Sequence, residues 1–176
     1  MEKESDLKRI INDSLISSFE PTDYSDVGQG QLLAEAYKHR LAYCDGMGWF
    51  TYKDGIWVQS DIEAHGYSQK LTDLQYQEAF TNQMAKITQR SSDASHDDPY
   101  LNYARLRRSS ARIAATLKEA TPKLSIEASV LDGDPLILNT PSGEIHLDTG
   151  EMTPHDPNHY ITHMTKLSPS EECYEL

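Results

Sequence analysis

The side chains of this sequence that could take part in chemistry begin with three regularly spaced histidines. His155, His159 and His163 recur every four residues, a spacing that on an α-helix would place three imidazoles on one side, as a metal site requires. Two prolines lie in the same stretch and make it a poor helix, so the spacing loses its geometric meaning. We therefore expect histidines that are exposed or satisfied by hydrogen bonds, and we predict no metal ligands.

Three aspartates form a second candidate site. Asp132, Asp134 and Asp148 are of the residue type that holds divalent ions in phosphoryl or nucleotidyl transfer. The run Asp132-Gly-Asp-Pro135, however, has the composition of a chain reversal, in which short carboxylates bind neighbouring backbone amides. We expect turn residues here and no catalytic residue in the chain. A metal-dependent nuclease is the alternative, and it would require magnesium- or manganese-dependent cleavage that disappears in Asp132→Ala.

A basic segment is the third candidate. Between Tyr103 and Lys123 the only acid is Glu119, and the segment carries six cations, which are Arg105, Arg107, Arg108, Arg112, Lys118 and Lys123. Three of the arginines lie three and four residues apart, so they share one face of a predicted helix. Such a face can present guanidinium groups to a nucleic-acid backbone or to an acidic neighbouring subunit. A plain solvated helix surface explains the same pattern.

The rest of the charge has the opposite sign. The formal net charge of the 176 residues is −12, a field that repels phosphate unless the cations are segregated. After the basic segment, Lys166 stands alone among ten acids. This acidic segment is either a solvated shell or a docking face for a basic partner.

Size and composition indicate one domain that folds without staples. Cys44 and Cys173 are far apart and form no Cys-x-x-Cys pair, so neither a disulfide framework nor a zinc ribbon is predicted. The sequence has no run of about 18 apolar residues, and its N-terminus lacks the basic-then-apolar order of a signal peptide. We expect a soluble cytoplasmic protein that does not enter a membrane.

Four helices are expected to position these groups. Residues 1–20 have one apolar face and end at Glu20-Pro21, as a docking helix or a frayed leader would. Asp26 can cap a second helix that runs to about residue 41. Residues 61–90 are mostly helical, although Gly66 can split them, and a polar loop follows at 91–99. A last helix fits 100–120 and ends at Pro122. The inward residues predicted for the last two helices include Phe80, Met84, Ile87, Leu101, Leu106, Ile113 and Leu117.

Two β segments complete the predicted fold. Asp54-Gly55 is a turn signal between two aromatic runs, so residues 48–59 form a hairpin whose Trp49 and Trp57 we expect to pack in the core; a base-stacking platform is the alternative. Between Leu136 and Met152 the apolar residues alternate as in half-buried strands. The intervening turns supply Gly143 and Gly150. A three-stranded meander follows, and the fold class is α+β, with helices packed on short antiparallel hairpins and no Rossmann or P-loop sheet.

The meander region also resembles a known family. Its runs are similar to the end of the N-terminal domain of the poxvirus-type and phage or plasmid primase-helicases, although Ser142-Gly143 replaces the usual Asn-Gly turn and His146 the usual aspartate. The runs that carry the resemblance are Leu131-Asp132-Gly-Asp-Pro-Leu-Ile-Leu-Asn139, Ser142-Gly143 and His146-Leu147-Asp148-Thr149-Gly150. Upstream, Ser25-Asp26-Val27-Gly28 and the aromatic hairpin match as well. The resemblance divides the chain into a leader (1–22), the accessory domain (23–168) and the start of a linker toward an ATPase domain (169–176).

The resemblance implies a non-catalytic N-terminal domain of a replicative DNA primase-helicase of a phage, plasmid or integrated element. Such a domain would help subunits associate and guide DNA toward a superfamily 3 ATPase, with ATP and Mg bound in that other domain. The sequence itself has no Gly-x-x-x-x-Gly-Lys-[Ser/Thr] loop, no Gly-x-Ser-x-Gly elbow and no His-Glu-x-x-His pair. The alternative is a free-standing acidic adaptor that binds a host replication protein through its C-terminal third.

Overall fold

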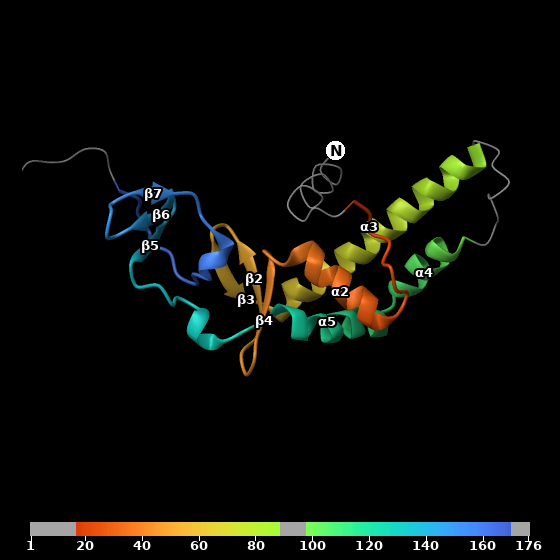
Figure 1. Cartoon of the computed structure of the whole chain (residues 1–176), viewed down its shortest axis with the longest axis horizontal. Helices are drawn as coiled ribbons and strands as arrows, with labels where there is room; N and C mark the ends of the chain where they lie inside the picture. The colour runs from red at the N-terminus through yellow and green to blue at the C-terminus, as the bar shows by residue number, and fades with distance from the viewer. Residues whose placement is uncertain (1–16, 89–97, 170–176) are drawn as a thin grey trace, which may run out of the picture.

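The computed structural model describes residues 17–88 and 98–169, so the predicted leader helix lies almost wholly outside the described residues. The described part is elongated, with a helical body at one end and a small sheet at the other (Figure 1). The helices are α2 (Asp26–Tyr37), α3 (Asp61–Thr88), α4 (Pro99–Arg107) and α5 (Ser110–Leu124). These helices and two short-stranded sheets confirm the predicted α+β class.

The first sheet joins the predicted hairpin to two strands that the sequence did not indicate. Its order is β3-β2-β1-β4, formed by β1 (Leu41–Cys44), β2 (Gly48–Lys53), β3 (Ile56–Gln59) and β4 (Ser125–Ile126). Lys53 pairs with Ile56 across the two-residue turn, so the hairpin and its turn are confirmed. The parallel pair β1–β4 is only two residues long and brings the end of α5 beside the hairpin.

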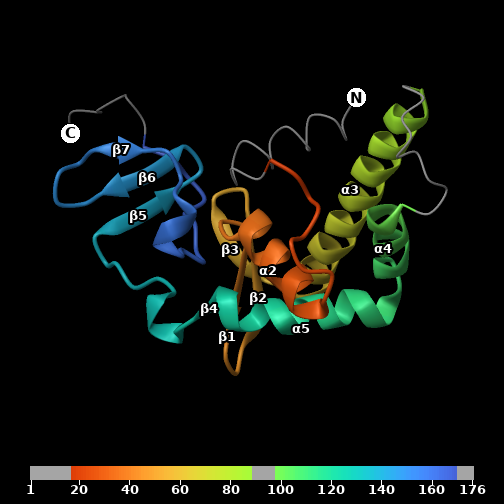
Figure 2. The same ribbon diagram turned by 45° about the vertical axis from the view of Figure 1, so that its right-hand side comes forward.

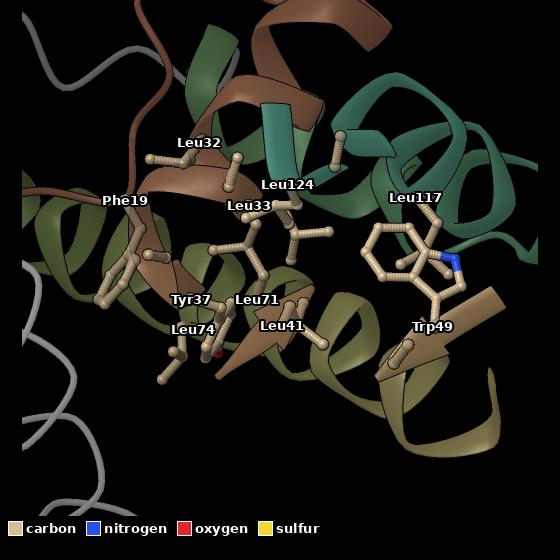
Figure 3. Close-up of a cluster of buried hydrophobic side chains, with 14 residues drawn as sticks. Phe19, Leu32, Leu33, Tyr37, Leu41, Trp49, Leu71, Leu74, Leu117 and Leu124 are labelled. Atoms are coloured by element: carbon tan, nitrogen blue, oxygen red, sulfur yellow. The ribbon is translucent and has the colours of Figure 1, made fainter. Parts of the chain in front are cut away.

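The core lies between α2, α5, α3 and this sheet (Figure 3). Leu33 of α2 and Leu71 of α3 are fully buried in this cluster, which also contains Trp49 of β2. Trp57 is 1% exposed in a second cluster on the other side of the sheet. Both tryptophans therefore pack in the core as predicted, and they offer no stacking platform for bases.

The N-cap of helix α2 lies one residue earlier than predicted. The Ser25 hydroxyl accepts the backbone N–H of Gly28, so Ser25 is the N-cap and Asp26 is the first helical residue. At Gly30 the helix touches α5 so closely that a Cβ there would lie 2.7 Å from the Glu119 backbone carbon. Leu41, predicted as the end of this helix, belongs to β1.

Helix α3 is 28 residues long and continues through Gly66, so the predicted helix is confirmed without a split. The predicted inward face is wrong in its second half. Phe80, Met84 and Ile87 are 40% to 46% exposed, because this end of the helix extends past the core and α4 packs beside another side of it (Figure 2). The periodicity that indicated the apolar face is real, but this part of it has no partner within the described chain.

The predicted helix over 100–120 is two helices. α4 starts at Pro99, with the Asp98 carboxylate accepting the Leu101 N–H, and it stops at Arg107; α5 begins again at Ser110. Pro122 does not end α5, which runs two residues further. Its ring sits at an exposed position in the final turn, where the loss of one helical hydrogen bond costs least. Leu106, predicted to pack, is 72% exposed.

The predicted meander is present, with its buried and exposed faces exchanged. Its strands are β5 (Ile137–Thr140), β6 (Gly143–His146) and β7 (Met152–Thr153), in the order β5-β6-β7. The register sets Leu138, Ile145 and Met152 side by side on one face, and Asn139, Glu144 and Thr153 on the other. The polar face is the buried one, since Asn139 and Glu144 are at most 4% exposed. The expected half-buried leucines therefore point outward.

The polar face docks on the tip of the β2–β3 hairpin. Asn139 donates from its amide to the Gly55 carbonyl oxygen at 3.0 Å, and the Trp57 indole N–H donates to the Pro157 carbonyl oxygen at 2.8 Å. Pro157 opens the 3₁₀ turn η2 (Pro157–His159); a second turn, η1 (Ala128–Val130), lies between the sheets. Gly55 has φ +84° and meets the His155 ring, which a Cβ would approach to 2.7 Å. Polar contacts, together with the close approach of His155 to Gly55, thus hold the small sheet against the hairpin.

Candidate nucleic-acid and subunit interface

The six predicted cations fall into two groups. Three of them are held by acids of the protein: Arg107 and Arg112 by Asp26, and Arg108 by Asp73. The other three, Arg105, Lys118 and Lys123, are exposed and form no ion pair within residues 17–88 and 98–169. The break at Ser109 separates Arg105 from Arg112, so the predicted single helical face of arginines is wrong.

Arg107 has a structural position. Its side chain is 4% exposed, and its guanidinium donates to the Asp26 carboxylate and, at 2.9 Å, to the Tyr24 carbonyl oxygen. The guanidinium carbon also lies 4.5 Å from the centroid of the Tyr103 ring. The charge of Arg107 is therefore used within the protein, where it ties α4 to the start of α2.

Asp26 is shared by a second arginine. Arg112 reaches the same carboxylate oxygen at 2.9 Å from the first turn of α5, while about half of its side chain stays exposed. Burial raises the pKa of Asp26, but the hydrogen bonds and charges of Arg107 and Arg112 outweigh burial and hold that pKa below its usual value. The carboxylate is therefore the charged junction of α2, α4 and α5.

Arg108 is less firmly held. It pairs with Asp73 of α3 at 2.7 Å and lies 5.2 Å from the centroid of the Tyr76 ring. About half of each charged side chain is exposed, and such pairs contribute at most about 1 kcal/mol. Arg108 and Arg112 can thus exchange part of their contacts for a phosphate, whereas Arg107 cannot do so without unpacking α4.

A buried pair of glutamine amides joins α2 to α3. No local pattern in the sequence indicates this pair. Gln29 of α2 and Gln75 of α3 are fully buried and exchange two hydrogen bonds, of 2.8 and 2.9 Å. The Tyr103 hydroxyl donates to the Gln29 oxygen, and the Gln75 amide also donates to the Phe19 carbonyl oxygen. Because buried polar groups need partners, this network fixes α4, one of the two helices that carry the cations, through Tyr103.

The histidines are distributed over different partners. His155 contacts the Thr140 carbonyl oxygen at 2.8 Å, and His159 contacts the Glu144 carboxylate at 2.5 Å. His163 lies 3.2 Å from Asp132. No group of three or more His, Cys, Asp or Glu side chains that could hold a metal ion occurs among the described residues.

The aspartates of the predicted turn occupy a turn, as their context indicated. Asp132 has φ +51°, and its carboxylate accepts the backbone N–H and the hydroxyl of Thr162. Burial raises the pKa of Asp132, yet the hydrogen bonds from Thr162 and His163 outweigh burial and lower it. Asp134 accepts the N–H of Leu136 at 2.9 Å. These carboxylates organise the loop that leads into the small sheet.

Two further predicted turn glycines have distinct roles. Gly150, with φ +73°, lies in the β6–β7 turn as expected. Gly143 follows the two-residue turn and opens β6, where a Cβ would lie 2.4 Å from the Thr153 carbonyl oxygen of β7. Both serve the geometry of the small sheet.

No helix in the described part of the chain is long and apolar enough to span a membrane.

A comparison with curated proteins finds no match. Residues 30–176 match the family described as "D5 N terminal like", which covers both sheets and all of α3, α4 and α5. The match extends over most of the chain and includes the meander and the aromatic hairpin on which the resemblance rested, whereas Ser25-Asp26-Val27-Gly28 lies before it. The chain therefore belongs to the family of N-terminal domains of D5-type primase-helicase proteins.

Proposed function

We propose that this chain is a non-catalytic domain that guides DNA and supports subunit association in a replicative primase-helicase of the phage or plasmid type. Membership in the family supports the part of the proposal that makes the parent protein a primase-helicase. The observation that carries the DNA part is the set of three exposed cations on α4 and α5, Arg105, Lys118 and Lys123, which have no acidic partner among the described residues.

The charge distribution explains why this segment suits a nucleic acid. With a net charge of −12, most of the surface repels phosphate, so a strand can approach only where cations are segregated. Helices α4 and α5 are consecutive and meet at Ser109 (Figure 2), so these cations come from two adjacent helices. The half-exposed Arg108 and Arg112 can join them, since their ion pairs are weak.

Chemistry is assigned to another part of the parent protein. ATP hydrolysis with Mg would belong to a superfamily 3 ATPase domain, and the residues described above would position DNA and neighbouring subunits for it. Four of these residues support this division, because Asp132, Asp134, His155 and His159 are engaged in turn or docking contacts.

Fluorescence anisotropy with labelled single-stranded DNA tests the proposal. We expect binding by the wild type that weakens with salt, and loss of most of it in the triple variant Arg105→Ala/Lys118→Ala/Lys123→Ala. For three phosphate contacts, the slope of log K against log salt should become shallower by about 2. The matched control is Lys38→Ala/Lys53→Ala/Lys166→Ala, which removes the same charge from other exposed positions.

The control decides between local contact and general charge. Equal weakening in both triple variants would contradict a basic DNA site on α4 and α5. Absence of DNA binding by the wild type would instead favour the free-standing adaptor, which acts through the acidic C-terminal third.

A further inference from the structure

The second half of α3 carries an apolar stripe that the described part of the chain leaves exposed. Phe80, Met84 and Ile87 are 40% to 46% exposed and are spaced by four and three residues, so they lie along one side of the helix. Helix α4 packs elsewhere on α3, through the cluster that contains Ala79. A contiguous apolar row of this kind is typical of an interaction surface.

The residues beside this stripe add to its apolar character. Around the helix, the stripe is followed by Thr81, Ala85 and Thr88, which are all exposed. The Thr81 and Thr88 hydroxyls donate to the carbonyl oxygens of Gln77 and Met84, at 2.8 and 2.9 Å. Since these hydroxyls are used within the helix, the two threonines offer methyl groups to a partner. The stripe therefore borders a row of small side chains against which a second helix can pack.

The chain enters the helical body close to this stripe. The Ser18 hydroxyl and the Phe19 N–H each donate to the Glu78 carboxylate at 2.8 Å. Phe19 is 2% exposed and belongs to the core, so this attachment is firm. Glu78 comes just before Phe80, so the N-terminal segment, residues 1–16, is tethered where the exposed half of α3 begins. A tether gives the segment a high effective concentration at the stripe.

The N-terminal segment has a matching pattern. It lies outside the described residues, but its sequence places Leu7, Ile10, Ile11 and Leu15 at the spacings of one helical face. As a helix, residues 7–15 span about 12 Å, and residues 80–88 of α3 span about the same length. The chain between Leu15 and Ser18 can reach about 10 Å, which is enough to pass around α3 from Glu78 to the stripe.

We propose that residues 7–15 form a helix that covers the exposed stripe of α3 in the same chain. The two helices are then antiparallel, because the N-terminal segment ends where the exposed half of α3 begins. Its apolar face packs on Phe80 and Met84, while Arg9 and Asn12 on its other side face solvent. This contact depends neither on DNA binding nor on subunit association, so it stands apart from the proposed function.

Hydrogen exchange of the full chain, measured by mass spectrometry at a low and a high protein concentration, tests the contact. We expect protected amides in residues 7–15 of the wild type, since a helix of this length is marginal in water without a partner. Met84→Glu and Ile11→Glu each place a charge in the apolar contact, so exchange in residues 7–15 should become faster by about tenfold or more. Unchanged exchange in α2 and α5 checks that the variants fold.

Ile62→Glu and Asn12→Glu are the matched controls, because they add the same charge outside the contact. Ile62 is 86% exposed in the first turn of α3, and Asn12 lies away from the apolar face of the N-terminal segment. Both controls should keep residues 7–15 as protected as in the wild type.

Three results would overturn the proposal. The first is a wild type whose residues 7–15 exchange as fast as an unstructured peptide. The second is exchange in Met84→Glu that is no faster than in Ile62→Glu. The third is protection that disappears on dilution, which would show that a second copy covers the stripe and that the contact is not within one chain.

Discussion

The buried guanidinium of Arg107 donates to the carboxylate of Asp26, which lies 81 residues earlier in the chain. This contact joins the first turn of α2 to the last turn of α4. The backbone carbonyl of Tyr24 satisfies the other guanidinium nitrogen. The pair therefore sets the position of α4, which carries Arg105 and Arg108. Two predictions follow from it, one for stability and one for its pH dependence.

Asp26→Asn should lower the free energy of unfolding by about 1–3 kcal/mol, because Arg107 remains buried without a charged acceptor. Denaturant unfolding followed by circular dichroism measures the change. Asp73→Asn is the matched control, since it removes the partner of the half-exposed Arg108 and should cost at most about 1 kcal/mol. Equal effects of the two variants would show that burial of Arg107 does not matter.

The same pair predicts a pH dependence. The pKa of Asp26 is lower in the folded protein than its usual value of 3.8. A lowered folded-state pKa gives stability that is present above the unfolded pKa and is lost as pH falls through the folded pKa. The gap in unfolding free energy between wild type and Asp26→Asn should thus be constant at neutral pH and shrink below about pH 4. A gap that widens on acidification would contradict the lowered pKa.

Much of the fold could be predicted from local patterns. Asp54-Gly55 is a turn in which both residues have positive φ, and this turn with the aromatic runs on either side located the hairpin correctly. The apolar periodicity located α3, and glycine-containing turns located the meander. These features depend on neighbours in the sequence, so one sequence is sufficient to predict them.

The errors concern contacts between distant residues. Alternation shows that Leu138 and Asn139 face opposite ways, but it does not show which face is buried. Here the polar face is buried because Asn139 and Glu144 find partners on the hairpin and the 3₁₀ turn. Likewise, nothing near Arg107 in the sequence reveals that Asp26 will neutralise it.

Two helical glycines should respond in opposite ways to alanine. Gly30→Ala should destabilise the protein by about 1–3 kcal/mol, since its Cβ would lie 2.7 Å from the Glu119 backbone and force α2 and α5 apart. Gly66→Ala should stabilise it by about 0.5–1 kcal/mol, because nothing lies within 4 Å and alanine favours the helix. Thermal and denaturant unfolding measure both. Effects of the same sign would refute the close approach at Gly30.

Gly55→Ala should release the small sheet from the body. The substitution costs about 1–2 kcal/mol in the left-handed conformation, and its Cβ would also meet the His155 ring at 2.7 Å. Hydrogen exchange measured by mass spectrometry should show faster exchange in β5 and β6, by about tenfold or more, with α2 and α5 unchanged.

The matched control for this prediction is Gly46→Ala, because Gly46 also has a positive φ, +76°, but a Cβ added there would meet no atom within 4 Å. It carries the backbone strain without the collision, so exchange in β5 and β6 should stay at the wild-type rate. The double variant Gly55→Ala/His155→Ala removes the ring and should recover part of the protection. If Gly55→Ala and Gly46→Ala exchange alike, the small sheet is not held by the fit between Gly55 and His155, and the polar contacts of Asn139 and Trp57 alone position it.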